Sequence, residues 1–437
     1  VYDLAITANR PDGMSVIGIA REISALLETT LTFPALNHKY NINIIDNLDL
    51  CSEAISSNCI YTISHIKSLS GKKSSPNWLK DRLEKSGINT INLLVDITNY
   101  ILLEQGQPLH AFDKDKLSSL IGKEVLPEYF SVRKANKNES LLCLNGENYK
   151  LNENITIIAC CNIPVAIAGV IGGLQSAVSE ETTSIYLEGA VFNSVCIRKS
   201  LKEIGIRTES SSRFEKGISF KNTLDAVTRA INLLEEYFDI PKTIINSSLD
   251  ITSNETLIPL RRDRVHKILG PLLINKNQEI NNIKVEKRKL LDKEITDKLE
   301  LIGCTLEKKE YGWDVKVLPN RSQDLIREID LIEEIARLIG YDSFDLKLPN
   351  PIKPGKLSSS QVALRKLKTG FIGVGFNEVL SKIADSHPNS PLADKVNKTD
   401  TIAQNKVRNV AKKHKLIDVG GQNLGQKFKK NKSTGLY

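Results

Sequence analysis

The 437-residue sequence contains no run of about 20 uncharged apolar residues, the length that a membrane-spanning helix needs. Its first residues, Val1–Ile6, predict a strand rather than a secretory signal peptide. The seven cysteines form no C-x-x-C pair, and an odd, scattered set argues against a disulfide framework. These absences predict a cytoplasmic protein without a membrane partner, whose thiols are reduced and mostly buried, including the adjacent pair Cys160 and Cys161.

The formal net charge of +8 comes from one end of the chain. Residues 395–437 carry 11 lysines and arginines against two acidic residues, so the rest of the chain is nearly neutral. A polar, lysine-rich segment buries too little apolar surface to fold by itself. We therefore expect residues 381–437 to be disordered or aberrant, with a genuine basic tail that binds nucleic acid as the alternative.

Short strands and helices alternate along the chain, a pattern typical of an α+β protein with several domains. Apolar periodicity predicts helices at residues 15–27, 78–86, 225–237, 294–302 and 327–338. Short apolar runs predict strands at residues 42–45, 92–95, 155–168, 184–187 and 313–317. Turn-forming and proline-rich stretches then divide the chain into segments at 1–40, 45–245, 255–349, 356–380 and 381–437. The second is a mixed α/β domain, and the third is a smaller helix-and-strand domain with an acidic helix.

Three segments of the mixed domain carry side chains suited to a ligand site. His110 follows a Pro-Leu pair, Glu188 ends an apolar strand, and the A-G-V-I-G-G segment at 168–173 allows close backbone approach to a ligand. Each also has an ordinary structural explanation: a buried hydrogen bond, a solvated strand end and a tight turn. The glycine segment has neither the spacing of a Rossmann fingerprint nor the lysine of a Walker loop.

A further cluster is acidic. Asp330, Glu333 and Glu334 have the i, i+3, i+4 spacing of one helix face, and Asp324 precedes them. Carboxylate oxygens suit Mg²⁺, but a solvated face paired with Arg327 and Arg337 is the alternative. Three arginines open the smaller domain and either contact nucleic-acid phosphate or form surface salt bridges: Arg261, Arg262 and Arg264.

Six motifs occur in a characteristic order along the chain: N-R-P-D, D-I-T-N-Y, Q-P-L-H-A-F-D, A-G-V-I-G-G, L-E-G-A and R-T-E-S-S-S-R-F-E-K-G. Over about residues 1–380 the chain resembles the β subunits of bacterial phenylalanyl-tRNA synthetases (phenylalanine–tRNA ligases). The resemblance implies a remnant of the split N-terminal domain at 1–40, an editing domain at 45–245 and the start of a synthetase-like domain at 356–380. It also implies that the chain is truncated at both ends.

The resemblance further implies that the editing domain hydrolyses tyrosine wrongly esterified to phenylalanine tRNA. It assigns His110 and Asn99 to positioning the ester or the terminal adenosine, and Thr208 to holding the amino acid or water. The implied substrate-binding residues are Glu188, which accepts a hydrogen bond from the phenol, together with Gly169, Gly172, Gly173, Ala190 and Ser210. Ser210 and Gly189 depart from the family's usual alanine and serine, and no residue is an obvious general base.

Partners and cofactors also follow from the resemblance. It implies an α2β2 heterotetramer in which the α subunit uses ATP to charge phenylalanine tRNA, and it implies a Mg²⁺ site shared with that subunit. The implied metal ligands are Asp324, Asp330, Glu333 and Glu334. The alternatives are a non-catalytic assembly or tRNA-binding module, a free-standing editing hydrolase, and an inactive fragment.

Overall fold

The computed structural model groups the chain into two compact units, 1–346 and 347–437. It describes residues 4–34, 41–45, 49–50, 60–69, 71, 74–248, 257–274, 286–345, 355–376, 378–379 and 417–418. The first unit carries all the elements that form the sites discussed below.

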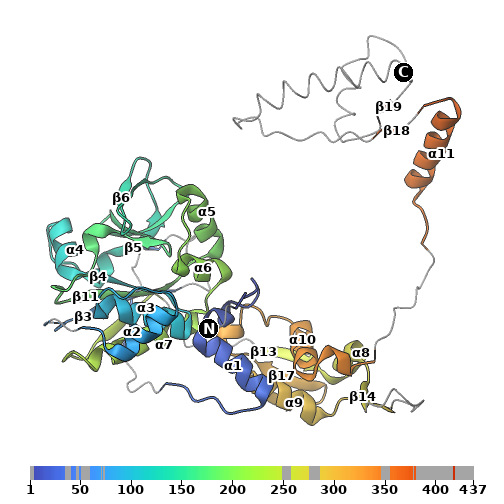
Figure 1. Cartoon of the computed structure of the whole chain (residues 1–437), viewed down its shortest axis with the longest axis horizontal. Helices are drawn as coiled ribbons and strands as arrows, with labels where there is room; N and C mark the ends of the chain where they lie inside the picture. Colours follow the sequence, from blue (N-terminus) through green and yellow to red (C-terminus); the bar gives the residue numbers. More distant parts are fainter. Residues whose placement is uncertain are drawn as a thin grey trace, which may run out of the picture. The chain divides into compact units, whose positions relative to one another are not determined.

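A five-stranded sheet forms the centre of the larger part of the first unit (Figure 1). Its strands, in spatial order, are β1 (Asn41–Ile44), β12 (Ile244–Ser247), β3 (Ile60–Ile66), β11 (Ile185–Val191) and β4 (Leu109–Asp113). All neighbouring strands are antiparallel except β1 and β12. Every residue of β11 is buried, which requires a covering layer on each face of the sheet.

Helices cover one face of this sheet. They are α3 (Leu93–Gln105) and α7 (Phe220–Glu235), and their side chains share a core with alternate residues of β11, Ile185 and Leu187. The residue between them, Tyr186, belongs to a different core on the opposite face. Because successive side chains of a strand point to opposite faces, Glu188 lies on the face of Tyr186, away from the helices.

A second five-stranded sheet covers that opposite face. Its strands, in spatial order, are β10 (Ile171–Gly172), β9 (Ile163–Ile167), β8 (Thr156–Cys160), β5 (Phe130–Lys134) and β2 (Asp49–Leu50). Phe130 and Ile158 of this sheet pack in one core with Tyr186 of the first. A β6–β7 hairpin (Ser140–Leu142 and Asn148–Lys150) lies beside it. The remaining elements of this part are α2 (Asn77–Lys85), α4 (Lys114–Ile121), α5 (Ser194–Ile204), α6 (Glu209–Lys216) and the 3-10 turns η1 (Pro11–Met14), η2 (Pro127–Tyr129) and η3 (Leu174–Ser176).

The smaller part of the first unit has its own core around Trp313, Leu299 and Leu331. Its elements are a three-stranded sheet of β13 (Leu257–Arg261), β17 (Gly312–Lys316) and β16 (Thr305–Lys309), the pair β14 (Leu272–Ile274) and β15 (Glu286–Arg288), the helices α8 (Arg262–Leu269), α9 (Asp292–Leu301) and α10 (Glu328–Ile339), and the turns η6 (Pro319–Arg321) and η7 (Tyr341–Ser343). Each of the five predicted helices is present, with ends within five residues of the prediction, whereas α3, α4, α5, α6 and α8 were not predicted as helices.

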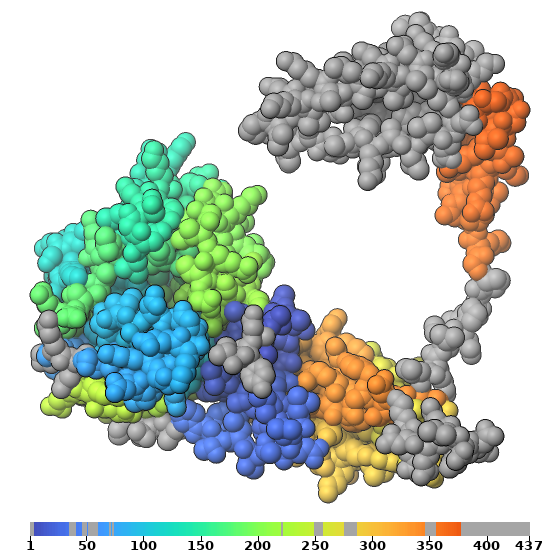
Figure 2. Space-filling model, viewed as in Figure 1, coloured from blue at the N-terminus to red at the C-terminus, as the bar shows by residue number. Residues whose placement is uncertain are grey.

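Helix α1 (Val16–Leu27) connects the two parts. Ser15 caps its N-terminus by accepting a hydrogen bond from the Gly18 amide at 3.0 Å. Its residue Ala25 belongs to the core of the smaller part, and Glu22 accepts from Arg337 at 2.8 Å. Figure 2 shows this dark blue helix against the orange and yellow surface of residues 257–345.

Three predicted strands are corrected by the structure. Residues 92–95 begin helix α3, because the Asn92 side chain accepts from the Val95 amide at 3.0 Å and caps a helix. The run 155–168 is a hairpin, since Cys161 and Asn162 both have positive φ (48° and 67°), as a tight two-residue turn requires. Residues 4–6 form no strand, and the start of that prediction lies outside the described residues.

Cys161 is consequently half-buried in the turn, not in the core, whereas Cys160 is buried. The α+β, multidomain fold class is confirmed, while the five domain boundaries stay predictions. The second unit contains α11 (Ser359–Gly373), β18 (Glu378–Val379) and β19 (Ile417–Asp418); most of the predicted tail, like Cys51 and Cys59, lies outside the described residues. Within the described ranges, no helix has the length and apolar character to cross a membrane.

Candidate functional site

A pocket of about 380 Å³ lies beside the core between the two five-stranded sheets and extends to the first turns of α3. We call it the Glu188 pocket. Six of the nine predicted editing residues line it: Asn99, His110, Gly169, Gly172, Glu188 and Ser210. Most of its remaining wall is apolar, and includes Ile158, Phe192 and Phe214.

Glu188 and His110 are direct neighbours across the sheet. Glu188 of β11 is the register partner of His110 of β4 in the antiparallel pair, so both side chains stand on the face that looks toward the second sheet. Glu188 is only 5% exposed. The His110 ring packs edge-on against Phe112, with a distance of 4.5 Å between ring centroids.

Burial makes both groups uncharged at neutral pH. It raises the pKa of Glu188 to about 8 and lowers the pKa of His110 to about 4, because each charged form would be poorly solvated in this pocket. Within the described residues, Glu188 Oε2 and His110 Nε2 are buried and have no hydrogen-bond partner. Buried polar atoms normally find partners, so this pair is suited to a ligand that supplies them.

Tyr61 is a third polar group on this face and was not predicted from the sequence. It is fully buried, its hydroxyl has no partner among the described residues, and it sits in register with Ala190 on β3. Burial, and then the neighbouring Glu188, raise the pKa of Tyr61. A tyrosine in an apolar strand gives no sequence signal that separates it from a core residue.

Two glycines shape the pocket for steric reasons. A Cβ on Gly172 would lie 2.4 Å from His110 Cε1 and 2.7 Å from Nε2, so only glycine leaves room for the imidazole. Gly169 has a φ of +66°, and a Cβ there would press on Phe214 and Ile197 at 2.8 Å. Gly173 lies outside the pocket, and its amide donates to the Val165 carbonyl at 2.9 Å.

The other predicted residues lie next to the pocket. Thr208 caps α6 by accepting from the Ser211 amide at 3.1 Å, and its hydroxyl donates to the carbonyl of the pocket residue Val170 at 2.9 Å. Ala190 is buried in the core. A Cβ on Gly189 would meet Val227 of α7 at 2.6 Å, so this position faces the helices and not the pocket, unlike Ser210.

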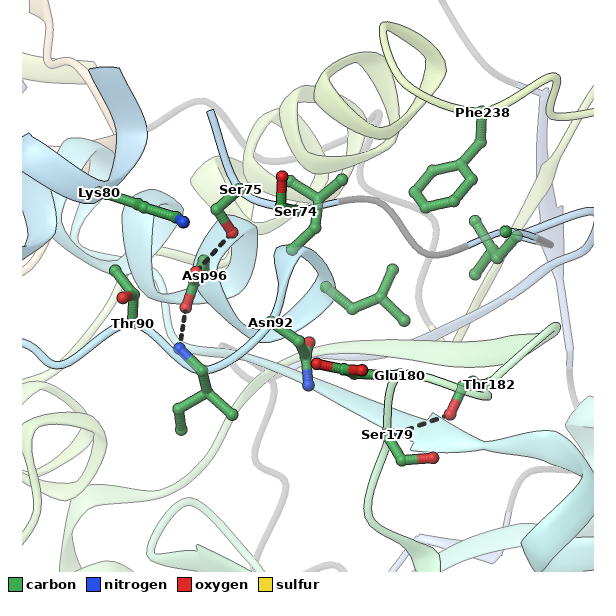
Figure 3. A pocket seen from close by; sticks show the side chains of 15 residues that line it. Ser74, Ser75, Lys80, Thr90, Asn92, Asp96, Ser179, Glu180, Thr182 and Phe238 are labelled. Atoms are coloured by element: carbon green, nitrogen blue, oxygen red, sulfur yellow. Dashed lines mark hydrogen bonds between the residues drawn. The ribbon is translucent and has the colours of Figure 1, made fainter. Parts of the chain in front are cut away.

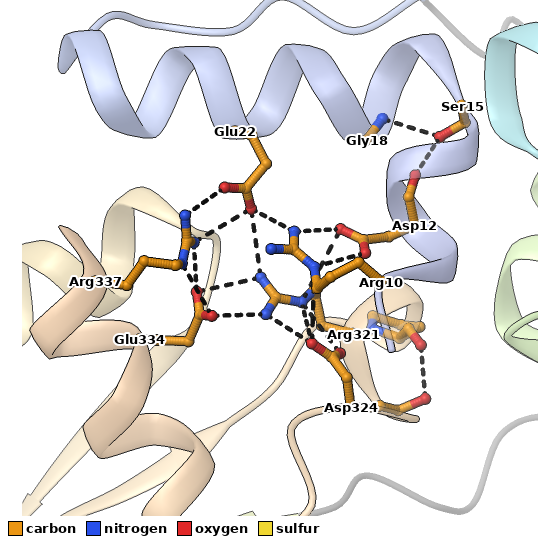
Figure 4. Close-up of polar contacts among 11 residues, drawn as sticks. Arg10, Asp12, Ser15, Gly18, Glu22, Arg321, Asp324, Glu334 and Arg337 are labelled. Atoms are coloured by element: carbon orange, nitrogen blue, oxygen red, sulfur yellow. Dashed lines mark hydrogen bonds and ion pairs between the residues drawn. The ribbon is translucent and has the colours of Figure 1, made fainter. Parts of the chain in front are cut away.

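The four predicted metal ligands do not converge. Asp324 and Glu334 accept hydrogen bonds from Arg321 at 2.7 and 3.4 Å, and Glu334 also accepts from Arg337 at 2.6 Å (Figure 4). Asp330 accepts from the backbone amide and the side chain of Arg327, while Glu333 is exposed. In the part of the chain that the structure describes, no three His, Cys, Asp or Glu side chains are placed to hold a metal ion.

Charge within this acidic group is balanced by arginine. Burial acts to raise the pKa of Glu334, but Arg337 and Arg321 outweigh it and the pKa is lowered. For Asp324, burial dominates and raises the pKa despite Arg321. As arranged, the group does not fit a magnesium site, because guanidinium groups occupy the positions from which a cation would be bound.

The three arginines of the smaller domain also have carboxylate partners. Arg261 and Arg264 pair with Glu328 at 2.7 and 3.3 Å, and Arg262 pairs with Asp292 at 2.7 Å. These contacts support the salt-bridge interpretation of the two that the sequence left open.

Comparison with known proteins agrees with this architecture. Residues 58–239 match the family model described as B3/4 domain, and residues 258–341 match the one described as tRNA synthetase B5 domain. A crystal structure of an N-terminal fragment of the phenylalanyl-tRNA synthetase beta-subunit from Pyrococcus horikoshii covers 77% of this chain and 86% of that chain. Its 16% identity and TM-score of 0.37 are too low to add to the argument.

Curated relatives share long stretches of sequence with the chain. The phenylalanine–tRNA ligase beta subunits of Prochlorococcus marinus subsp. pastoris (strain CCMP1986 / NIES-2087 / MED4) and of strain MIT 9312 are 75% and 72% identical over 381 residues, 87% of this chain. That of Parasynechococcus marenigrum (strain WH8102) is 40% identical over 392 residues, 89% of this chain. The chain spans about half the length of these relatives, 46–47%. The sequence matches and the two domain matches together show that the chain belongs to the family of phenylalanine–tRNA ligase beta subunits.

Proposed function

We propose that the Glu188 pocket is an editing site that removes tyrosine wrongly esterified to phenylalanine tRNA. The observation that carries the proposal is the pair Glu188 and His110, two uncharged groups with unpaired buried atoms in a mostly apolar pocket. Tyrosine is phenylalanine plus one hydroxyl, and an apolar pocket rejects such an isostere only modestly. A site that hydrogen-bonds the hydroxyl discriminates far better.

Glu188 provides the discrimination in this proposal. Its carboxyl group hydrogen-bonds the phenol of a bound tyrosine, whereas phenylalanine leaves the group unpaired. An unpaired buried polar group costs about 1–3 kcal/mol, which corresponds to roughly 5- to 150-fold in selectivity. The wall of Phe192, Phe214 and Ile158 holds the ring that both amino acids share.

Hydrolysis depends mainly on positioning. Water attacks the ester carbonyl, the new C–O bond forms as the bond to the ribose oxygen breaks, and that oxygen takes the proton that the attacking water gives up. With a pKa of about 4, His110 is a weak base at neutral pH, so its role is to orient the ester or the water by hydrogen bonding, together with Asn99. Thr208 acts indirectly: its hydroxyl donates a hydrogen bond to the carbonyl of Val170, a residue of the pocket wall, and so holds that wall in place.

The proposal includes the partners of the whole enzyme. ATP-dependent charging of phenylalanine tRNA belongs to an α subunit in a cytoplasmic α2β2 assembly, and this chain supplies editing and support. The residues Asp324, Asp330, Glu333 and Glu334 do not converge here, so no step of the proposed reaction is assigned to Mg²⁺.

The test is release of tyrosine from tyrosine-charged phenylalanine tRNA, with phenylalanine-charged tRNA as the control. We expect selective tyrosine release, reduced roughly 5- to 150-fold in Glu188→Ala and also reduced in His110→Ala. The chain is assayed alone and with the α subunit. Equal rates for wild type and Glu188→Ala in both settings would identify a scaffold instead, and failure of the chain to co-purify with the α subunit would point to a free-standing hydrolase.

A further inference from the structure

A second pocket, of about 350 Å³, lies at the N-terminal end of α3, next to the Glu188 pocket (Figure 3). We call it the Lys80 pocket. The two pockets share the lining residue Ile91. They also meet along the chain at Val178, which lines the Glu188 pocket, and Ser179, which lines the Lys80 pocket. When the reacting end of a ligand occupies the Glu188 pocket, the Lys80 pocket therefore lies directly beside that ligand.

The divide between the pockets is held in place by Asp96. This carboxylate is 1% exposed and accepts from the Ile91 amide at 2.9 Å and from the Ser75 hydroxyl at 2.5 Å. Both of its oxygens thus stabilise the pocket wall. The Ile91 side chain, by contrast, is 69% exposed and forms an apolar ridge on a fixed backbone.

Donor groups remain available inside the Lys80 pocket. Among the residues that the structure describes, the Lys80 ammonium has neither an ion pair nor a hydrogen bond. Asn92 uses its side-chain oxygen for the Val95 amide and keeps its amide N–H groups for a ligand. Figure 3 shows Lys80 and Phe238 at opposite sides of the view, with Asn92 and Glu180 between them.

The mixed lining selects a class of ligand. A simple anion would meet the Glu180 carboxylate as well as Lys80, and an apolar ligand would leave the Lys80 ammonium and the Asn92 amide N–H groups without partners. A single-stranded ribonucleotide has a phosphate for Lys80, hydroxyl donors for a carboxylate, and a flat base for the ring of Phe238.

We propose that the Lys80 pocket binds the single-stranded RNA next to the esterified nucleotide, so that the RNA strand crosses the Ile91 ridge between the two pockets. Lys80 contacts the backbone phosphate and Phe238 stacks on a base. This inference rests on the proposed function for the chemistry of the ester, but RNA binding at the Lys80 pocket is measurable without it.

The test uses the full chain and a fluorescently labelled four-nucleotide RNA with the sequence of the tRNA 3′ end, followed by anisotropy. The variants are Lys80→Ala and Phe238→Leu, which keeps apolar volume but removes the flat ring. Lys85→Ala is the matched control, because Lys85 is on the same helix, is 71% exposed, pairs with Asp81 at 2.6 Å and does not line the pocket. Unlabelled RNA, DNA of the same sequence and inorganic phosphate serve as competitors.

We expect Lys80→Ala and Phe238→Leu each to weaken RNA binding by roughly five-fold or more, with less than two-fold for Lys85→Ala. RNA competes better than DNA, and phosphate at the same concentration does not compete. No RNA binding by the wild type, or equal binding by all variants, overturns the inference. RNA binding that depends on Lys80 in a chain that releases no tyrosine overturns the proposed function and leaves this inference standing.

Discussion

At the scale of single residues, the Glu188 pocket depends on keeping two titratable groups uncharged. Glu188 and His110 are adjacent in register but form no ion pair in the structure, and burial shifts the pKa of each toward its neutral form. A neutral carboxyl both donates and accepts hydrogen bonds, which suits recognition of a phenol. The pH dependence of the unfolding free energy therefore shows whether Glu188 and His110 are charged in the folded protein.

The first prediction concerns Glu188 and pH. Its folded-state pKa of about 8 is above the usual 4.5, so its contribution to stability is complete below pH 4.5 and is lost as the pH rises toward 8. The pKa of His110 is lowered to about 4, so His110 contributes fully to stability above pH 6.5 and loses this contribution as the pH falls. Between pH 6.5 and 8, therefore, only the titration of Glu188 changes the stability that this pair provides. Over that interval we expect wild type to lose about 1–2 kcal/mol of unfolding free energy relative to Glu188→Gln.

Urea unfolding at half-unit pH steps measures this difference, and other titrating groups cancel because they are common to both proteins. Parallel stability curves for the two proteins would show that Glu188 is ionised in the folded state.

The second prediction concerns Gly172. Its backbone is not in the left-handed region, so Gly172→Ala acts mainly through the clash of the new Cβ with the His110 ring, with a looser contact to Leu144 Cδ1 at 3.2 Å. We expect a loss of about 1–3 kcal/mol of unfolding free energy, as for other overpacked sites. In a His110→Ala background the same substitution should cost much less, because the ring is gone. A double-mutant cycle by urea unfolding measures the coupling, and additive effects of the two substitutions would argue against the contact.

At the scale of secondary-structure elements, the pocket wall depends on how helices begin. Thr208 starts α6 and in the same position binds the Val170 carbonyl, so one side chain both caps a helix and fixes the glycine-containing loop. Asn92 similarly starts α3, the helix that brings Asn99 to the pocket and Asp96 to the ridge. Both caps come from short local motifs, yet each sets the position of residues distant in sequence.

The third prediction separates these roles of Thr208. Thr208→Ala removes both hydrogen bonds and should cost about 1 kcal/mol of unfolding free energy, the usual value of a lost cap. Thr208→Ser keeps the hydroxyl and should lie within a few tenths of wild type. Thermal unfolding compares the three proteins, and tyrosine release should fall in the alanine variant alone. Equal stability of the alanine and serine variants would contradict the capping role.

At the scale of the whole first unit, buried ion pairs connect the N-terminal segment to the smaller part. Arg321 is 4% exposed and lies within 4.0 Å of four carboxylates: Asp12, Glu22, Asp324 and Glu334. Arg10 pairs with Asp12 and Glu22 at 2.9 and 2.5 Å. The N-R-P-D motif is therefore structural, and so are Arg213 and Lys216, which donate to the carbonyls of Met14 and Ile6.

The fourth prediction is that Arg321→Met destabilises the first unit by about 3–5 kcal/mol, because it leaves buried carboxylates without a counter-charge. Arg327→Met is the control: Arg327 is 75% exposed and pairs with Asp330 at the surface, so the loss should be below about 1 kcal/mol. Both are measured by urea unfolding. Similar losses for the two variants would show that the network contributes no more than a surface pair.

Wild type and Arg321→Met also test whether the acidic group of Asp324, Asp330, Glu333 and Glu334 binds Mg²⁺. Millimolar Mg²⁺ should leave the thermal midpoint of wild type unchanged, because arginines already neutralise Asp324 and Glu334. Arg321→Met should instead be stabilised by Mg²⁺, which replaces the missing positive charge. A midpoint that rises with Mg²⁺ in wild type would show that the acidic group binds metal without the α subunit.

Much of the fold was predictable from local pattern. Amphipathic periodicity located α1, α7, α9 and α10, since a helix that buries one face repeats its apolar residues along that face. The pattern failed at 92–95 and 155–168, where a short apolar run does not distinguish a strand from a buried helix start or from two strands joined by a tight turn. In both cases the deciding signal was polar: an asparagine at the cap of α3 and an asparagine in the turn.

The sequence by itself determined the α+β class, the positions of five helices and, through the order of its motifs, the family and six of the residues that line the Glu188 pocket. Only the tertiary structure decided which of them meet. It placed Glu188 beside His110, turned Gly189 to the opposite face, added Tyr61 and paired the acidic helix with arginines. The physical reason is that strand register, side-chain alternation and burial join residues far apart in the chain, and these relations set the distances and the pKa values on which the chemistry depends.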